Sequence, residues 1–189
     1  MRHHKSSFAK KMQRIFLIAI SAFFTLVSGC ANMRLPKPPL YAPFTAQKAG
    51  SLFTTELRVV EHRKYEFTLL VSIKKGENTE DSKRLLKLMG RTGKDKDGKM
   101  MSPGIAIPLK LTISVIDTSG ESIIYDKEVH EEEMQSGGGG TYEKLIDLIE
   151  LMPGGHYRVT LQSLQDVPEF SGNPISVGIH GHYNTNPID

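Results

Sequence analysis

The most regular feature of this sequence is a two-residue alternation of apolar and polar side chains. Tyr65, Phe67 and Leu69 alternate with Glu66 and Thr68, and comparable segments recur along the chain. Such alternation is typical of β-strands that have one buried face and one face in water. The predicted strands of this kind are residues 53–59, 65–73, 109–115, 123–129, 157–161 and 175–183.

One further segment, residues 145–151, fits a helix as well as a strand. Leu145, Leu148 and Ile149 share one face of a helix, whereas Ile149 and Leu151 share one face of a strand. Periodicity alone does not decide between the two, so the sequence that follows this segment carries the interpretation.

A proline–glycine turn comes directly after this segment. Its residues Leu151, Pro153, Gly154 and Tyr157 resemble the tyrosine corner of immunoglobulin-like and fibronectin type III domains. The resemblance implies that the preceding segment is a strand and that the Tyr157 hydroxyl bonds to backbone upstream. An ordinary turn followed by a core tyrosine is the alternative. With seven strands, the expected fold is all-β, a single antiparallel sandwich of the immunoglobulin or fibronectin III type.

The longest interruption of the strand pattern is residues 76–106, and it is rich in basic side chains. Asp81 is placed to cap a short helix that presents Leu85 and Met89 on one face and ends at Gly90. Cations gathered in this way suit an acidic partner or a phosphate-bearing headgroup, and a solvated loop is the alternative. The candidate partner-binding residues are Lys83, Arg84, Lys87 and Arg91.

An acidic run at residues 126–133 is followed by four glycines at residues 137–140. Consecutive glycines disfavour regular structure, so we expect a mobile acidic loop here. Adjacent carboxylates on such a loop are poorly held for acid–base catalysis. The sequence contains no nucleophile elbow or phosphate-binding loop. A calcium-binding EF-hand loop that begins at Asp95 needs glutamate at its twelfth position, which here is Ala106. We therefore predict no catalytic residues.

His180 and His182 lie two residues apart in the last predicted strand. Residues at this spacing share one face, so both imidazoles are expected to point out of the core and into solvent. Together they supply half of a zinc or copper site. The position of a third ligand stays open, with His130 and His156 as candidates. Solvent-facing strand residues without a metal are the alternative.

The N-terminal residues have the order of an export signal. Residues 1–14 carry five basic side chains and no acid, and residues 15–26 are almost wholly apolar. Residues 27–30, Val-Ser-Gly-Cys, resemble the lipobox of bacterial lipoproteins. The resemblance implies cleavage after residue 29, acylation of Cys30 and, because Ala31 follows, a location on the outer membrane. An uncleaved anchor or a signal that ends in a free cysteine is the alternative, and Met12 is a second candidate start.

The mature chain is therefore expected to begin at Cys30. Removing residues 1–29 removes five of the 24 basic residues and none of the 21 acids, so the net charge of +3 becomes −2. The alkaline balance belongs to the signal, and no nucleic-acid partner is expected. Proline-rich residues 30–50 are predicted to be a lipid-anchored tether, unless Tyr41 and Phe44 pack on the domain. Residues 51–189 are assigned to the sandwich, with the basic insertion at 76–106.

These features predict a membrane-anchored periplasmic lipoprotein that acts as a non-catalytic binding module for a protein partner. The chain resembles proteobacterial lipoproteins that contain domains of unknown function. With Cys30 acylated, no cysteine remains for a disulfide or for nucleophilic attack, and no cofactor beyond the covalent lipid is expected. One alternative is an immunity lipoprotein that neutralises a toxin delivered to the periplasm. The others are a metal-handling protein or enzyme that uses His180 and His182, and a structural part of an envelope assembly.

Overall fold

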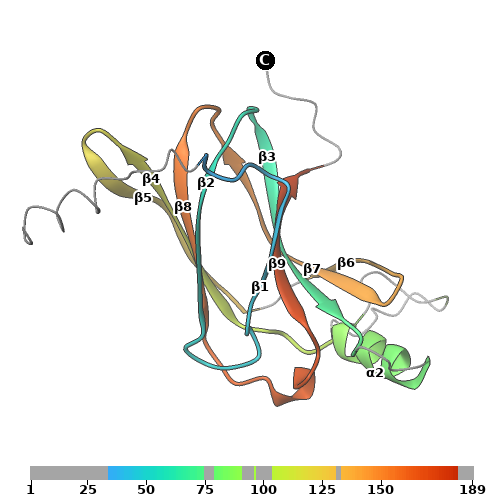
Figure 1. Cartoon of the computed structure of the whole chain (residues 1–189). Coiled ribbons are helices and arrows are strands. Elements are labelled where there is room, and N and C mark those ends of the chain that lie inside the picture. Colours follow the sequence, from blue (N-terminus) through green and yellow to red (C-terminus); the bar gives the residue numbers. More distant parts are fainter. Residues whose placement is uncertain (1–33, 75–78, 91–95, 97–103, 131–132, 183–189) are drawn as a thin grey trace, which may run out of the picture. The chain divides into compact units, whose positions relative to one another are not determined.

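Two antiparallel sheets face each other and enclose the core of the protein (Figure 1). The computed structural model describes residues 34–74, 79–90, 96, 104–130 and 133–182. The first sheet has the order β1-β9-β3-β7-β6, and the second sheet has the order β2-β8-β4-β5. The elements are β1 (Leu40–Pro43), β2 (Leu52–Arg58), β3 (Arg63–Ser72), α2 (Thr79–Met89), β4 (Leu109–Asp117), β5 (Gly120–Val129), β6 (Glu133–Gly138), β7 (Thr141–Leu151), β8 (His156–Ser163), η1 (Pro168–Phe170) and β9 (Ile175–Gly181).

The predicted all-β sandwich is confirmed, and each of the seven predicted strands is present. The ambiguous segment at residues 145–151 belongs to β7, which is antiparallel to both β3 and β6. Inward-facing apolar residues from both sheets, such as Phe67, Leu111, Val159 and Ile179, are fully buried. Burying a side chain of this size stabilises the fold by about 1.5–3 kcal/mol relative to leaving it exposed. The apolar residues of the alternating segments are thus the residues that form the core.

The pairing of the outer strands differs from that of an immunoglobulin domain. There, the first strand pairs with the second and the last strand pairs with the sixth. Here the last strand, β9, is antiparallel to β3, and the early strand β2 is antiparallel to β8. The exchange leaves β9 between β1 and β3, inside its sheet rather than at an edge. Side chains on β9 therefore have neighbours on both sides.

The turn between β7 and β8 has the hydrogen bonds of a tyrosine corner. The buried Tyr157 hydroxyl donates to the Met152 carbonyl at 3.1 Å and accepts from the Met152 N–H at 3.0 Å. Gly154 has a φ of +78°, which favours glycine. At Gly155, a Cβ atom would lie 2.4 Å from the Tyr157 ring. The two glycines therefore let the chain turn while the tyrosine ring stays packed beneath it.

Strand β1 and the residues after it contradict part of the predicted tether. All four residues of β1 pair with β9. Phe44, which follows β1, is buried, and its N–H donates to the Ile175 carbonyl at 2.9 Å. A proline-containing segment can pair here because β1 is an edge strand, where a missing N–H breaks no ladder on the open side. The sandwich thus begins before residue 51, and the tether predicted for residues 30–50 is wrong over residues 40–46.

The glycine-rich segment forms strand β6, so the mobile loop predicted there is wrong. Its backbone is antiparallel to β7, with Gly138 opposite Thr141. Gly139 and Gly140 have φ values of +58° and +82°. Two consecutive left-handed residues are what a tight two-residue hairpin turn requires, and glycine adopts them at the lowest cost. The glycine run is therefore a hairpin signal.

Helix α2 packs on the sandwich through its apolar side. Leu85 and Met89 are fully buried, and Gly90, which follows the helix, has a φ of +79°. The Ile105 N–H donates to the Leu88 carbonyl at 2.7 Å, so the returning chain is held against the end of the helix. Among the described helical segments, none has the length and apolar character needed to cross a membrane.

The predicted cap of α2 is wrong, because the helix begins at Thr79 and Asp81 lies in its first turn. The buried Asp81 carboxylate accepts a hydrogen bond from the Lys74 N–H at 3.0 Å and two from the Arg84 guanidinium. The backbone bond from Lys74, followed by the bonds from Arg84, holds the pKa of Asp81 below its ordinary value. Asp81 thus ties the helix to the end of β3.

Candidate functional site

Four ionisable side chains converge on the outer face of the first sheet. Glu66 lies on β3, Glu143 on β7 and His180 on β9, and His182 follows β9 directly. The three strands are neighbours in the order β9-β3-β7, as Figure 1 shows. The register places Glu66 directly opposite His180. The sheet therefore brings together groups that are far apart in the sequence.

The contacts of this cluster are those of a buried histidine–carboxylate group. His180 Nε2 lies 3.0 Å from Glu143 Oε1 and 4.0 Å from Glu66 Oε2. The other Glu66 oxygen, Oε1, forms a hydrogen bond with His182 Nδ1. Glu66 and His180 are only 4% and 6% exposed. One ligand atom from each of Glu66, Glu143 and His180 lies within 4.8 Å of the other two, a spacing compatible with a shared metal ion.

The predicted exposure of the two histidines is wrong for His180. It is buried because β9 has neighbours on both sides, and the ring of Tyr41 on β1 lies 6.2 Å from the His180 ring. The side chain of His182 is partly exposed, at 26%. The two histidines nevertheless belong to one cluster, because each contacts Glu66.

The predicted third ligands, His130 and His156, do not belong to this cluster. His130 pairs with Glu128 at 3.3 Å, and His156 pairs with Glu56 at 2.7 Å on the second sheet. The structure places carboxylates beside His180 instead. The alternation in β3 puts Glu66 on the outer face, but no sequence signal specifies which strand lies beside it.

Thr68 lies next to the cluster on the same face of β3. It is fully buried, and its hydroxyl Oγ1 makes no hydrogen bond with any part of the chain that the structure describes. Its neighbour across the strands is Gly178, where a Cβ atom would lie 2.5 Å from Thr68 Oγ1. The glycine therefore leaves room for the hydroxyl. A buried and unpaired hydroxyl is unusual, since most such groups have a partner.

The predicted partner-binding residues divide into exposed and structural groups. Lys83 and Lys87 are exposed and lie one turn apart on α2, so they share a face of the helix. Lys83 makes an exposed ion pair with Glu80 at 2.9 Å, which leaves the face accessible. Arg91 lies outside the described residues, as do the signal segment and Cys30.

Arg84 is hydrogen-bonded within the fold, although its side chain is 40% exposed. Its guanidinium donates to Asp81 and to Asn173 Oδ1, both at 2.7 Å, and to the Glu169 carbonyl at 3.0 Å. Asn173 is buried and donates in turn to the Ser72 carbonyl at 2.9 Å. Arg84 therefore connects α2 to η1 and to the loop before β9, and its role as a partner contact stays a prediction.

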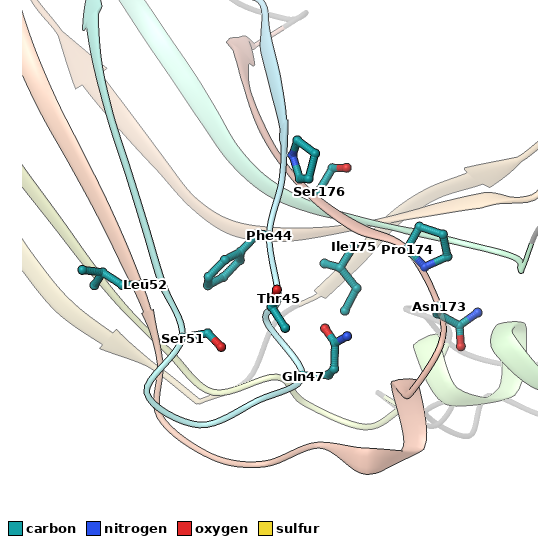
Figure 2. Close-up of a pocket in the computed structure, with 10 residues that line it drawn as sticks. Phe44, Thr45, Gln47, Ser51, Leu52, Asn173, Pro174, Ile175 and Ser176 are labelled. Atoms are coloured by element: carbon teal, nitrogen blue, oxygen red, sulfur yellow. The ribbon is translucent and has the colours of Figure 1, made fainter.

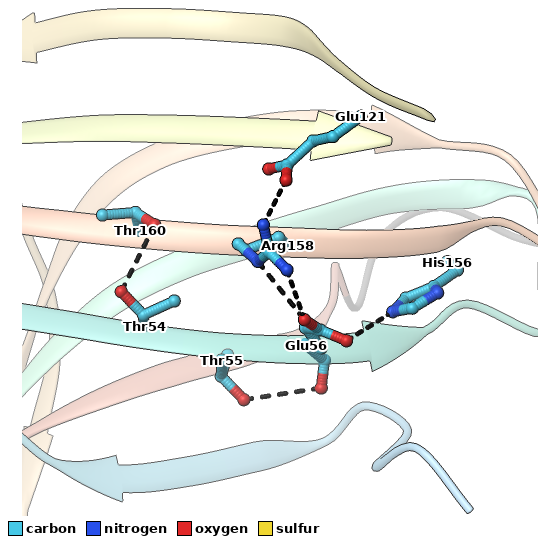
Figure 3. Close-up of polar contacts among 7 residues, drawn as sticks. All are labelled: Thr54, Thr55, Glu56, Glu121, His156, Arg158 and Thr160. Atoms are coloured by element: carbon cyan, nitrogen blue, oxygen red, sulfur yellow. Dashed lines mark hydrogen bonds and ion pairs between the residues drawn. The ribbon is translucent and has the colours of Figure 1, made fainter. Parts of the chain in front are cut away.

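A second polar network covers the outer face of the other sheet (Figure 3). Arg158 on β8 donates to Glu56 on β2 at 2.7 Å and also contacts Glu121 on β5. His156 lies on the other side of Glu56, at 2.7 Å. Hydrogen bonds from Arg158 and then His156 hold the pKa of Glu56 below its ordinary value. These groups are partly exposed and each carboxylate has a cationic partner, which is typical of a surface ion network.

A pocket of about 550 Å³ lies between the β1–β2 connection and the start of β9 (Figure 2). Apolar walls come from Phe44, Leu52 and Ile175, and the polar lining includes Gln47 and Asn173. The lining contains no acid, base, histidine or cysteine. Asn173 is already bonded to Arg84 and Ser72. The lining of the pocket therefore provides apolar surface and amide groups, but no acid–base pair for catalysis.

Comparison with known proteins assigns the chain to a family through its sandwich. The model of a domain of unknown function, DUF5625, matches residues 41–181. The chain belongs to the DUF5625 family. The matched residues run from β1 to the end of β9, so the DUF5625 domain contains Glu66, Glu143 and His180 as well as α2. No curated protein matches the chain.

The fold of this DUF5625 domain has a counterpart among solved structures. The crystal structure of a protein from Sulfurospirillum deleyianum is similar, with a TM-score of 0.64 and 22% sequence identity. The similarity covers 77% of this chain and 98% of that protein. At this identity, the likeness concerns the fold.

Proposed function

We propose that this protein is a membrane-anchored lipoprotein of the bacterial envelope and that its DUF5625 domain is a non-catalytic binding module for an acidic protein partner. The basic N-terminus, the apolar run and the Val-Ser-Gly-Cys sequence ending at Cys30 support the anchor and the periplasmic location. Two or more acyl chains would hold the domain on the outer membrane without a spanning helix.

The rigid mounting of α2 is the observation that carries the binding role. Leu85 and Met89 are buried on one side of the helix, and Arg84 fixes it to two other segments. The opposite side presents Lys83 and Lys87 to solvent at fixed positions. Cations held on a rigid support lose less conformational entropy on binding than cations on a flexible loop. This arrangement favours a partner with a matching acidic surface.

The anchor is tested by the Cys30→Ser substitution in cells. Without the acylated sulfur, the protein should leave the membrane fraction and retain its signal segment, because lipoprotein processing depends on this residue. Fractionation of the envelope and mass spectrometry of the N-terminus provide the measurement. Retention of the serine variant in the membrane, with unchanged processing, would contradict the anchor.

The binding surface is tested by capture of envelope proteins with the lipidated full chain in detergent. The test variant is Lys83→Glu/Lys87→Glu, and the matched control is Lys48→Glu/Lys64→Glu, which reverses two exposed charges elsewhere on the domain. A specific partner should be retained by the wild type and the control, be lost with the test variant, and weaken as salt is raised. Equal capture by all three proteins, or capture by none, would refute the role of α2.

A further inference from the structure

We propose that Glu66, Glu143 and His180 bind one Zn²⁺ ion and that His182 is a positioning residue that holds the Glu66 carboxylate. The site would lie on the outer face of the first sheet, across β3, β7 and β9 (Figure 1). It is separate from the exposed lysines of α2, and it does not depend on the binding role proposed for that helix.

The spacing of the ligand atoms fits a tetrahedral ion. Ligand atoms about 2.0–2.2 Å from a tetrahedral zinc lie roughly 3.3–3.6 Å from one another. His180 Nε2 is 3.0 Å from Glu143 Oε1 and 4.0 Å from Glu66 Oε2, so the observed separations bracket that value. The third separation, between the Glu66 and Glu143 oxygens, is within 4.8 Å, so side-chain adjustment within the cluster would seat the ion. Imidazole and carboxylate are both ordinary zinc ligands, and the three make the protein part of a site with an open fourth position.

The two oxygens of Glu66 have different roles in this geometry. Oε2 faces His180, whereas Oε1 is held by His182 Nδ1. A neighbouring group that fixes a ligand carboxylate is a common feature of metal sites, where it orients the ligand and raises affinity. The sequence His180-Gly181-His182 thus supplies one ligand and one positioning residue.

Thr68 provides an independent indication of a ligand beside the cluster. On β3, Thr68 lies between Glu66, which is opposite His180, and Leu70, which is opposite Glu143. The contact between the side chains of His180 and Glu143 therefore crosses β3 at Thr68. The Thr68 hydroxyl is fully buried there and has no partner among the described residues. A polar ligand bound beside this hydroxyl would supply that partner.

The donor set of the cluster also suits a divalent ion. Two carboxylates and His180 share a mostly buried site, so one ion there would interact with both anions at once. A histidine–carboxylate hydrogen-bond network without a metal is the competing arrangement, and direct metal titration separates the two.

The experiment is a zinc titration of the lipidated full chain in detergent, after removal of metal with a chelator. A chromophoric chelator competes for the ion and reports affinity and stoichiometry. We expect one zinc per chain, and Glu143→Gln should weaken binding by about 100-fold or more, since changes to mere outer partners of metal ligands already cost about 10–100-fold. The control is His62→Gln, which removes a similar but exposed histidine–glutamate contact, His62 to Glu150 at 2.6 Å, and should leave zinc binding unchanged.

Two further measurements keep the test decisive. Zinc should raise the unfolding temperature of the wild type and of His62→Gln but not of Glu143→Gln, which separates loss of a ligand from loss of the fold. If Glu143→Gln does not fold, His182→Gln replaces it, because that side chain is partly exposed, and affinity should fall by about 10–100-fold. No stoichiometric zinc at micromolar concentration, or equal uptake by the wild type and the cluster variants, would overturn the proposal.

Discussion

The Tyr157→Phe substitution tests the corner that joins the two sheets. The hydroxyl of Tyr157 makes two hydrogen bonds, both with Met152, and the tyrosine is only 4% exposed. Replacement by phenylalanine removes this hydroxyl and leaves the ring in place. The change therefore isolates the polar contribution of the corner from its packing.

The expected loss follows from the fate of the two Met152 groups. The carbonyl keeps a longer hydrogen bond from the Gly155 N–H at 3.4 Å, whereas the Met152 N–H loses the partner that it has here. The hydrogen bond of the Met152 N–H is partly buried and Met152 itself is exposed, so the loss is that of an ordinary hydrogen bond, about 0.5–1.5 kcal/mol, and no cavity term is added because the ring remains. We therefore expect the free energy of unfolding to fall by about 1 kcal/mol. For a chain of this size, each kcal/mol corresponds to a shift of about 2–4 °C in unfolding temperature.

The assay is urea unfolding of the full chain in a Cys30→Ser background, followed by circular dichroism. Ile123→Val is the control, because Ile123 is 65% exposed and its substitution should change stability by less than about 0.5 kcal/mol. If the Tyr157→Phe variant has the same free energy of unfolding as this control, the hydrogen bonds of the Tyr157 hydroxyl do not stabilise the fold.

Three further predictions concern α2 and the β6–β7 turn. Arg84→Ala should lower the free energy of unfolding by about 1–3 kcal/mol because Asp81 loses its charged partner, whereas Lys87→Ala should change it by less than about 0.5 kcal/mol in the same urea assay. Asp81→Asn should flatten the acid dependence of stability. Hydrogen bonds hold the folded-state pKa of Asp81 below its unfolded value of about 3.9. The stabilisation that the Asp81 carboxylate contributes is therefore present above that pH and is lost as the pH falls through the folded-state pKa. Unfolding temperatures of the two proteins, measured from about pH 2 to 7, should differ most at the upper end of this range and approach each other as the pH falls. Gly140→Ala should destabilise the protein by about 1 kcal/mol or more, because φ is +82° and the new Cβ would lie 2.9 Å from Ile73 Cδ1; an unchanged midpoint would contradict this.

The strands were predictable because a half-buried sheet imposes a two-residue period on its sequence. The alternation of Tyr65, Phe67 and Leu69 with polar residues identifies β3 and its inner face, and these three side chains are buried. The helix signal was also local, since the helical spacing of Leu85 and Met89 matches the buried side of α2. Features that depend on a short stretch of chain can thus be read from residue spacing.

Features that depend on long-range pairing could not be predicted in this way. His180 is buried because β9 inserts between β1 and β3, and neither neighbour is specified near His180 in the sequence. The pairing of β9 with β3 also places Glu66 beside His180. Glu143 comes from β7, part of which fitted a helix as well as a strand in the sequence. Lys144 is a further case. It is fully buried and donates to the Ile105 carbonyl at 2.8 Å, although lysine usually indicates an exposed position.

Glycine patterns were open to two interpretations, and the structural context decides between them. At Gly139 and Gly140 the backbone conformation that only glycine adopts readily closes a hairpin, so a segment of apparent flexibility joins two paired strands. Pro43 was ambiguous in the same way, since an edge strand such as β1 tolerates a proline. In each case the residue type specified a backbone conformation, but the partner strand determined its use.

In the proposed function, the exposed side of α2 binds a partner while the protein is anchored in the envelope. The most direct measurement is photocrosslinking in living cells, with a photoreactive residue at position 87 and, as a control, at position 48, which is also exposed. We expect an adduct of one defined mass at position 87 alone, which disappears when Lys83→Glu is added. The same adducts at both positions, or none at position 87, would contradict it.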